Sequence, residues 1–264
     1  GVNWKWRMHG GAITLADELN HYDKHIDLII CSDFLNLPVF KSLTQKKFKN
    51  IPMIMYFHEN QISYPWSPID RDPPQKRDLH YYYINYTSSL CSTWNLFNSR
   101  YHMHSYIKGL EGYLKMMPDH MNLGSAREIK KRSSVLYIGC DLRRFDDMPA
   151  TAEEKPLILW NHRWEFDKNP ESFFNILFRL KEDNIPFSLA VLGESFETYP
   201  DIFDTAKRKL NDQIIHWGYC KSSEEYKKWL QKGDILPITS IQEFFGVSAV
   251  EGAYSSIYPI LPNR

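Results

Sequence analysis

Along the first half of the chain, short apolar runs alternate with longer segments of helical periodicity. Runs of this length are typical of buried β-strands, and apolar positions three or four residues apart are typical of helices. Strands are predicted at 27–32, 51–57, 92–98 and 134–139. Helices are predicted near 12–20, 38–48, 76–90 and 99–111.

The second half repeats this alternation. Strands are predicted at 157–162, 187–192, 214–219, 234–239 and 258–261. One helix is predicted to open at Asn169-Pro170-Glu171, where proline occupies the first turn, and others near 200–210, 223–231 and 246–254. Continuous apolar strands separated by helices imply parallel βαβ units with helices on both faces of a sheet.

The best candidate for a domain boundary is the polar, acidic segment 146–156, which contains two prolines. The predicted fold class is therefore α/β, with two Rossmann-like, doubly wound domains at 1–150 and 151–264 that face a cleft. The chain opens on Gly1 and closes shortly after a strand-like stretch, so we expect a fragment that lacks a first strand and a C-terminal helix.

Composition excludes several classes of protein. The chain has 264 residues, of which 43% are hydrophobic and 24% charged, which fits a globular protein and excludes disordered and collagen-like chains. The longest apolar run, 51–57, is far shorter than the roughly 20 residues of a membrane span. The four cysteines form no CxxC pair, which indicates a reducing compartment such as the cytoplasm and no zinc site.

The net charge is zero, with 32 basic and 32 acidic residues. Residues 1–150 hold 19 Lys/Arg against 15 Asp/Glu, a balance of +4. This excess is compatible with a polyanionic partner, but it falls short of the basic footprint of a nucleic-acid-binding domain. An ordinary solvated surface explains it equally well.

Ligands of doubly wound sheets bind outside the carboxyl ends of the strands, and polar or glycine residues follow several predicted strands of the second half. Arg163 and Lys168 bracket a loop before a helix, where both cations could converge on a diphosphate. On spacing alone, two surface cations explain this pair better. Gly193 and Gly218 each end a strand and would let a ligand approach the backbone.

The segment 240–251 is the most informative candidate, because a strand runs through a glycine-containing turn into a helix. The backbone N–H groups of Phe245, Gly246 and Val247 would be available to anionic or hydroxyl oxygens. Glu251 points back toward the start of the helix, where a carboxylate can accept hydrogen bonds from a ribose diol. Glu243 in the turn can reach a sugar hydroxyl.

His58 directly follows the strand predicted at 51–57, which would place it at the mouth of the cleft. A histidine satisfied within its turn is the competing interpretation. Asp70-Arg71-Asp72 is interpreted as a surface loop among prolines and not as a metal motif. The chain has no GxGxxG and no Walker motif, which disfavours nicotinamide enzymes and P-loop NTPases.

Six motifs in order resemble the tRNA-queuosine mannosyltransferase family, also called glycosyltransferase-like domain-containing proteins, within the retaining GT-B glycosyltransferases of family 4. They are YFHENQ at 56–61 with Tyr64-Pro65, MPDH at 117–120, NHRWEFDKNPES at 161–172, VLGE at 191–194, HWGY at 216–219 and EFFGV at 243–247. The stretch WKWRMHGG at 4–11 is also similar to the segment after the family's first strand and loop.

The resemblance implies a GT-B enzyme that moves mannose from GDP-mannose to queuosine in a tRNA anticodon with retention, without a metal or an obligate protein partner. It would put Arg163 and Lys168 on the diphosphate, Glu251 on the ribose, and Glu243 with the backbone of residues 245–247 on the mannose. His58 would approach the sugar from the other domain. Two alternatives remain open: a lipid-linked or polysaccharide acceptor, and a non-catalytic module that binds sugar nucleotides or RNA.

Overall fold

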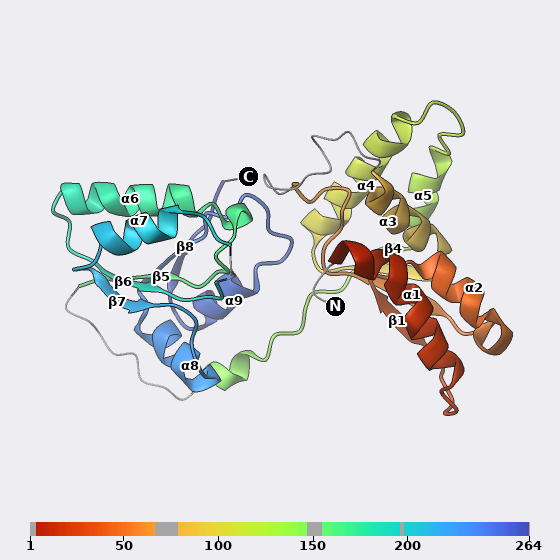
Figure 1. Cartoon of the computed structure of the whole chain (residues 1–264), viewed down its shortest axis with the longest axis horizontal. Helices are drawn as coiled ribbons and strands as arrows, with labels where there is room; N and C mark the ends of the chain where they lie inside the picture. The colour runs from red at the N-terminus through yellow and green to blue at the C-terminus, as the bar shows by residue number, and fades with distance from the viewer. Residues whose placement is uncertain (1–3, 67–78, 147–154, 196–197, 264) are drawn as a thin grey trace. The chain divides into compact units, whose positions relative to one another are not determined.

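The computed structural model describes residues 4–66, 79–146, 155–195 and 198–263. The chain forms two compact units, Gly1–Ile138 (unit 1) and Gly139–Arg264 (unit 2) (Figure 1). The expected boundary between residues 150 and 151, like the segment 70–72, lies outside the described residues. No helix in the described ranges is both long and apolar enough to cross a membrane.

Unit 1 contains a parallel sheet in the order β1-β2-β3-β4. Its strands are β1 (Ile29–Ser32), β2 (Met53–Phe57), β3 (Trp94–Phe97) and β4 (Ser133–Val135). Its helices are α1 (Trp4–Asn20), α2 (Leu37–Phe48), α3 (His80–Cys91), α4 (Arg100–Lys115) and α5 (Gly124–Lys131). Because every strand pair is parallel, the carboxyl ends of β1, β2 and β3 lie at one edge of the sheet.

The core of unit 1 lies on one face of this sheet. Alternate residues of β2, namely Met53, Met55 and Phe57, are buried in a cluster with side chains from helices α1 to α5. On the opposite face, Ile30 of β1 and Trp94 of β3 are exposed. Alternation along the strands therefore separates a packed face from an open one within the described part of this unit.

Helix α1 begins eight residues before the predicted start at residue 12, because it continues through Gly10 and Gly11. Glycine lowers helix propensity, and this pair conceals the helix in the sequence. Met8, Ala12 and Ala16 are buried at a four-residue spacing, so tertiary packing of one helical face outweighs the local preference.

Unit 2 contains a parallel sheet in the order β7-β6-β5-β8-β9, the 3-2-1-4-5 order of a doubly wound fold. Its strands are β5 (Leu157–Trp160), β6 (Ser188–Val191), β7 (Ile214–Trp217), β8 (Ile235–Pro237) and β9 (Tyr258–Ile260). Its α-helices are α6 (Pro170–Glu182), α7 (Ile202–Lys209), α8 (Ser223–Lys232) and α9 (Val247–Tyr254). Two short 3-10 helices, η1 (Leu142–Phe145) and η2 (Phe166–Lys168), are added to these.

Both faces of the unit 2 sheet are covered. Ile158 and Trp160 of β5 pack with α6 and α7, whereas Leu157 and Leu159 of the same strand pack with α8. Figure 1 shows α6 and α7 on one side of this sheet and α8 on the other. The continuous apolar run at 157–160 is therefore a strand buried on both faces, as the sequence predicted.

The predicted strands are found with shifts of a few residues at their ends, and α5 is the helix that the sequence analysis missed. This helix has eight residues, of which only Ala126 and Ile129 are buried. So short a buried stripe gives too few periodic positions to be recognised in a sequence.

The aromatic cluster around Phe203 predicts how much a cavity in the core of unit 2 lowers the free energy of unfolding. Phe203 is fully buried on α7 and its ring contacts those of Trp160, Trp164, Phe174 and Trp217. Phe203→Ala should lower the free energy of unfolding by about 3–5 kcal/mol in urea titrations, because it leaves a cavity among rigid rings. Lys207→Ala, at an exposed position of the same helix, should change it little, and equal effects of the two variants would contradict this packing.

Candidate functional site

The candidate site of unit 2 lies where the strand order of the sheet reverses. Strand β5 pairs with β6 on one side and with β8 on the other, so the loops that leave β5 and β8 start at the same sheet edge. Crevices of this kind are where open α/β sheets bind their ligands. The loop after β5 carries Arg163 and Lys168, and the loop after β8 carries Glu243 and Gly246.

Lys168 joins these two loops. Its Nζ lies 3.1 Å from Asp167 Oδ2 and 3.1 Å from Glu243 Oε2, and the residue is only 8% exposed. Burial alone would lower the pKa of Lys168, but the Glu243 and Asp167 carboxylates outweigh it and raise this pKa. The ammonium therefore stays charged and is shared between two carboxylates.

Backbone contacts strengthen the same connection. Thr239 Oγ1 donates to the Lys168 carbonyl at 2.7 Å, and the Ile241 N–H donates to the Asp167 carbonyl at 2.6 Å. Together with the Lys168–Glu243 pair, these bonds fix the loop after β5 against the loop after β8. The candidate residues on both loops are thus held in place by the protein itself.

A cavity of about 510 Å³ opens beside these loops, within the size range of small-ligand sites. It is lined by Arg144, Asn161, His162, Arg163, Leu192, Gly193, Glu194, Tyr219, Cys220, Lys221, Ser222, Ser223 and Tyr226. Arg163 is half exposed, with Nη2 3.2 Å from Glu165 Oε2. It is the sequence-predicted cation that the structure brings to the cavity.

Glu251 lies behind the cavity wall, on α9. Its Oε1 accepts a hydrogen bond from Arg144 Nη2, and its Oε2 accepts one from the Tyr226 hydroxyl at 2.7 Å. Burial and the Glu251 carboxylate raise the pKa of Tyr226, so this hydroxyl stays a donor. A carboxylate has about four acceptor positions, so Glu251 can still accept further hydrogen bonds. A role on the ribose stays a prediction.

Two glycines follow strands of unit 2, and each position requires glycine for a different reason. Gly193 has φ +103°, and a Cβ there would lie 2.0 Å from the His162 carbonyl oxygen. Gly218 has φ +120°, but a Cβ there would meet no atom within 4 Å. The first position therefore requires glycine to keep β6 close to the loop with Arg163, whereas the second requires it only for backbone conformation.

The remaining unit 2 candidates lie at the start of α9. Gly246, with φ +81°, precedes the helix, and no side chain caps it among the described residues. Phe245 lies before it and Val247 is the first helical residue. None of these three lines the cavity, and neither do Lys168, Glu243 or Gly218. Their predicted contacts with a sugar or diphosphate stay predictions.

His58 belongs to unit 1, where it follows β2 with an exposed side chain. Its ring lies 4.7 Å from that of Tyr56, and partial burial lowers its pKa. The imidazole is therefore neutral near pH 7 and can accept a proton or a hydrogen bond. Whether it acts on the sugar stays a prediction.

Several cavity residues were missed from the sequence, above all Arg144 and Tyr226. Arg144 precedes Phe145 in η1 and Tyr226 lies in the first turns of α8, far from any strand end. Their side chains meet only in the folded protein, where η1 contacts α9 and both residues bind Glu251 of that helix. Asn161, directly after β5, could have been found from its position at a strand end.

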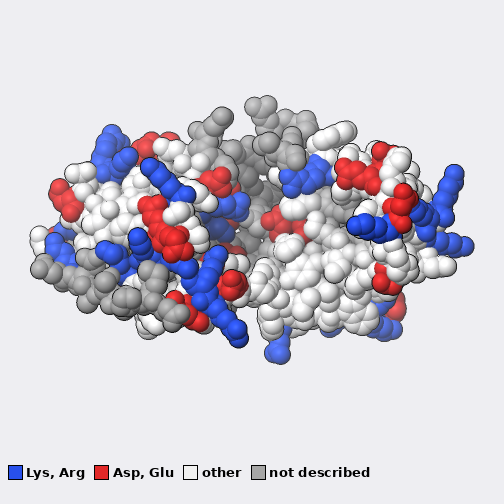
Figure 2. Space-filling view, turned by 90° about the horizontal axis from the view of Figure 1, so that it is seen from below, with Lys and Arg blue, Asp and Glu red and all other residues white. Residues whose placement is uncertain are grey.

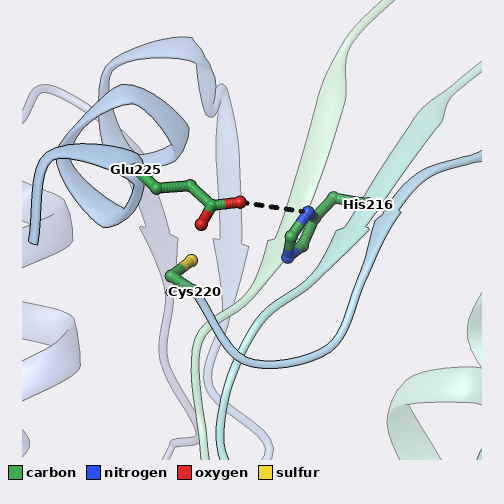
Figure 3. A group of neighbouring side chains, drawn as sticks. All are labelled: His216, Cys220 and Glu225. Atoms are coloured by element: carbon green, nitrogen blue, oxygen red, sulfur yellow. Dashed lines mark ion pairs between the residues drawn. The ribbon is translucent and has the colours of Figure 1, made fainter. Parts of the chain in front are cut away.

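His216, Cys220 and Glu225 are the described residues that could hold a metal, with ligand atoms within 4.8 Å of one another (Figure 3). The spacing of these residues in the sequence had suggested no such cluster. Glu225 Oε2 already accepts the Lys221 N–H at 2.8 Å, which stabilises the start of α8. Burial and the nearby Glu225 raise the pKa of Cys220 to about 11, so the thiol stays protonated. Glu225 thus has a structural role in this cluster apart from any metal.

Comparison with known proteins shows the class of the chain. Residues 143–263 match the family described as glycosyl transferases group 1, so unit 2 is a glycosyltransferase domain. HepE of Anabaena in complex with UDP and glucose has 12% identity and a TM-score of 0.60, covering 94% of this chain and 61% of that one. Sucrose-phosphate synthase of Thermosynechococcus elongatus has 15% identity and a TM-score of 0.61, covering 94% and 58%. These likenesses show the GT-B fold class.

Residues 1–140 match the N-terminal family of the tRNA-queuosine alpha-mannosyltransferases. The chain is also 32% identical over 270 residues to the tRNA-queuosine alpha-mannosyltransferase of Drosophila melanogaster, covering 99% of this chain and 70% of that protein. The chain therefore belongs to the tRNA-queuosine alpha-mannosyltransferase family, as its motifs predicted. It spans about three-fifths of the length of the solved structures that it matches.

The two glycines predict unequal costs of adding a methyl group. Gly218→Ala should cost only the left-handed backbone penalty of about 1–2 kcal/mol. Gly193→Ala should lower the free energy of unfolding by more, because its Cβ also meets the His162 carbonyl, and it should displace Arg163. Urea unfolding of both variants measures the difference, and equal losses would show that the Gly193 contact is not a constraint.

Proposed function

We propose that this protein transfers mannose from GDP-mannose to queuosine in a tRNA anticodon, with retention of configuration. The observation that carries the proposal is a cavity beside the loops that follow β5, β6 and β7 of the unit 2 sheet, with Arg163 on its wall, in a member of this family. The cavity is large enough for a nucleoside diphosphate. Arg163 is the exposed cation on its wall, and Glu251 lies behind this wall with its carboxylate hydrogen-bonded by Arg144 and Tyr226.

In this proposal, Arg163 stabilises the departing diphosphate. Negative charge builds up on the diphosphate as the bond to the sugar breaks, and a fixed guanidinium can stabilise this charge by donating two parallel hydrogen bonds to the diphosphate oxygens. Lys168, shared by Asp167 and Glu243, holds the loop that carries Arg163, and in this proposal its ammonium also contacts the diphosphate. These cations can serve the leaving group without a metal, and the absence of a metal requirement is part of the proposal.

The donor is oriented by the elements around Arg163. Glu251 accepts hydrogen bonds from the ribose hydroxyls while Arg144 and Tyr226 keep it in place. Glu243, with the backbone of residues 245–247, holds the mannose. Gly193 and Gly218 let the nucleotide approach the backbone. The reaction then depends on orientation of an oxocarbenium-like sugar more than on a strong base, and His58 assists it from unit 1.

The tRNA acceptor is supported by family membership more than by charge. On the face shown in Figure 2, Lys/Arg and Asp/Glu side chains are interspersed, and neither sign covers it alone. Because the chain as a whole has a net charge of zero, we expect phosphate contacts to be few and the nucleoside itself to contribute much of the recognition. The four free cysteines support a reducing compartment, and we propose that the protein works in the cytoplasm.

Loss of the Arg163 cation should slow the reaction. Arg163→Ala should lower kcat/KM for GDP-mannose by about 100-fold, because a preorganised charge at the leaving group is lost. Arg179→Ala, an exposed arginine in the last turn of α6, is the matched control and should leave kcat/KM unchanged. Transfer rates measured with radiolabelled donor give both values. Near-normal turnover of Arg163→Ala would contradict the assignment.

The acceptor is tested with transfer RNA that carries queuosine. Incubation with GDP-mannose should add the mass of one hexose to queuosine in digested nucleosides, measured by mass spectrometry, and leave tRNA without queuosine unchanged. Donor hydrolysis without this product would favour a glycosyltransferase with another acceptor. Saturable donor binding without hydrolysis or transfer would favour a non-catalytic module.

A further inference from the structure

The turn after β2 in unit 1 is held from both neighbouring strands. In the order β1-β2-β3, each strand is followed at the same sheet edge by a polar residue: Asp33 after β1, His58 after β2 and Asn98 after β3. The side chains of Asp33 and Asn98 form hydrogen bonds with the backbone of His58. His58 is exposed, whereas Asp33 and Asn98 are each only 2% exposed.

On the β1 side, Asp33 Oδ1 accepts the His58 N–H at 3.0 Å. Its carboxylate also accepts the backbone N–H of Glu59. Burial, followed by the nearby Glu59 charge, raises the pKa of Asp33 to about 7, and these backbone donors oppose that rise. Burying a carboxylate is unfavourable, so the position is occupied by Asp33 at a cost to stability.

On the β3 side, Asn98 Nδ2 donates to the His58 carbonyl at 2.8 Å. Asn98 Oδ1 lies 2.8 Å from His102 Nδ1, and an amide oxygen can only accept, so this nitrogen carries the proton. Burial, with a smaller effect of His58, lowers the pKa of His102 to about 3, which keeps the ring neutral. His102 therefore fixes which way the Asn98 amide points.

Asn85 of α3 completes the support. Its Nδ2 donates to the Asp33 carbonyl at 2.9 Å, and its Oδ1 accepts the Gln61 N–H at 2.7 Å. The turn that begins at His58 is thus tied to the ends of β1 and β3 and to α3 through one buried carboxyl group and two buried amides. The His58 imidazole itself makes no hydrogen bond within the described residues and contacts only the Tyr56 ring among aromatic side chains.

We propose that Asp33 and Asn98 are positioning residues that hold the backbone of His58 so that its imidazole is presented in one fixed place. The inference rests on the proposed function, because it presumes that His58 takes part in transfer. A positioning role explains why the N–H and the carbonyl of the exposed His58 are both hydrogen-bonded to buried side chains, those of Asp33 and Asn98, which follow the two adjacent strands. A side chain placed by its own backbone remains free to bind substrate.

The test separates positioning from ordinary stabilisation with a matched variant. Asn95 lies on β3, the strand that ends directly before Asn98, and it is fully buried. Its Nδ2 donates to the Ser89 carbonyl at 3.0 Å, and its Oδ1 accepts from Ser92 Oγ at 2.9 Å. Asn95→Ala and Asn98→Ala both remove a buried amide with two hydrogen bonds. Both should lower Tm to a similar extent.

Only Asn98→Ala should lower kcat, by about 10-fold or more, with KM for GDP-mannose unchanged, because a small displacement of a reacting group is costly. Asn95→Ala should keep kcat within about twofold of the unsubstituted protein. Equal kcat values for the two variants would overturn the proposal. Asp33→Ala, which removes the acceptor of the His58 N–H, should also lower kcat if Asn98→Ala does not fold.

A double variant tests whether Asn98 acts through His58. In a His58→Ala background, Asn98→Ala should have no further effect on kcat, whereas independent effects would multiply and would overturn the proposal. If His58→Ala alone keeps normal kcat, the proposed role of His58 fails. If His58→Ala lowers kcat and Asn98→Ala does not, only the positioning inference fails.

Discussion

The candidate site of unit 2 depends on one buried cation. The Lys168 ammonium lies between the carboxylates of Asp167 and Glu243, and so connects the loop after β5 to the loop after β8. These strands are neighbours in the sheet although more than 70 residues separate them in the chain. Removing one partner of such a buried set would leave an uncompensated charge, which is strongly unfavourable. The two loops are therefore fixed relative to each other before any ligand arrives.

This fixed edge of the sheet positions the polar residues that line the cavity. Arg163 is carried by the loop that Lys168 holds, and Gly193 lets β6 approach the same loop at the His162 carbonyl. Arg144 and Tyr226 of the cavity wall bind the two oxygens of Glu251, so its carboxylate is already oriented behind this wall. Unit 1 uses the same principle, since buried amides and one buried carboxyl group hold the turn at His58. In both units, buried polar side chains fix the backbone that carries an exposed candidate residue, Arg163 in unit 2 and His58 in unit 1.

The sequence predicted much of this architecture and less of the site. Apolar runs such as 157–160 and the Asn169-Pro170 helix start are local signals, so strands and helix starts were found where packing and propensity agree. The candidates Arg163, Gly193 and His58 were found because they follow strands. Arg144 and Tyr226 were not, because they reach the cavity through contacts between elements distant in the chain. Asp33 and Asn98 do follow strands, but their bonds to the His58 backbone join segments distant in the chain and could not be predicted. Lys168 shows the same limit: its position was predictable, but its two carboxylate partners were not.

The most direct test of the account is a crystal structure of the protein with GDP. The account predicts that the nucleotide occupies the cavity of unit 2, with a diphosphate oxygen within hydrogen-bonding distance of the Arg163 guanidinium, about 3 Å, and the ribose hydroxyls facing Glu251. A nucleotide bound elsewhere on the protein, or one in the cavity with its diphosphate directed away from Arg163, would contradict it.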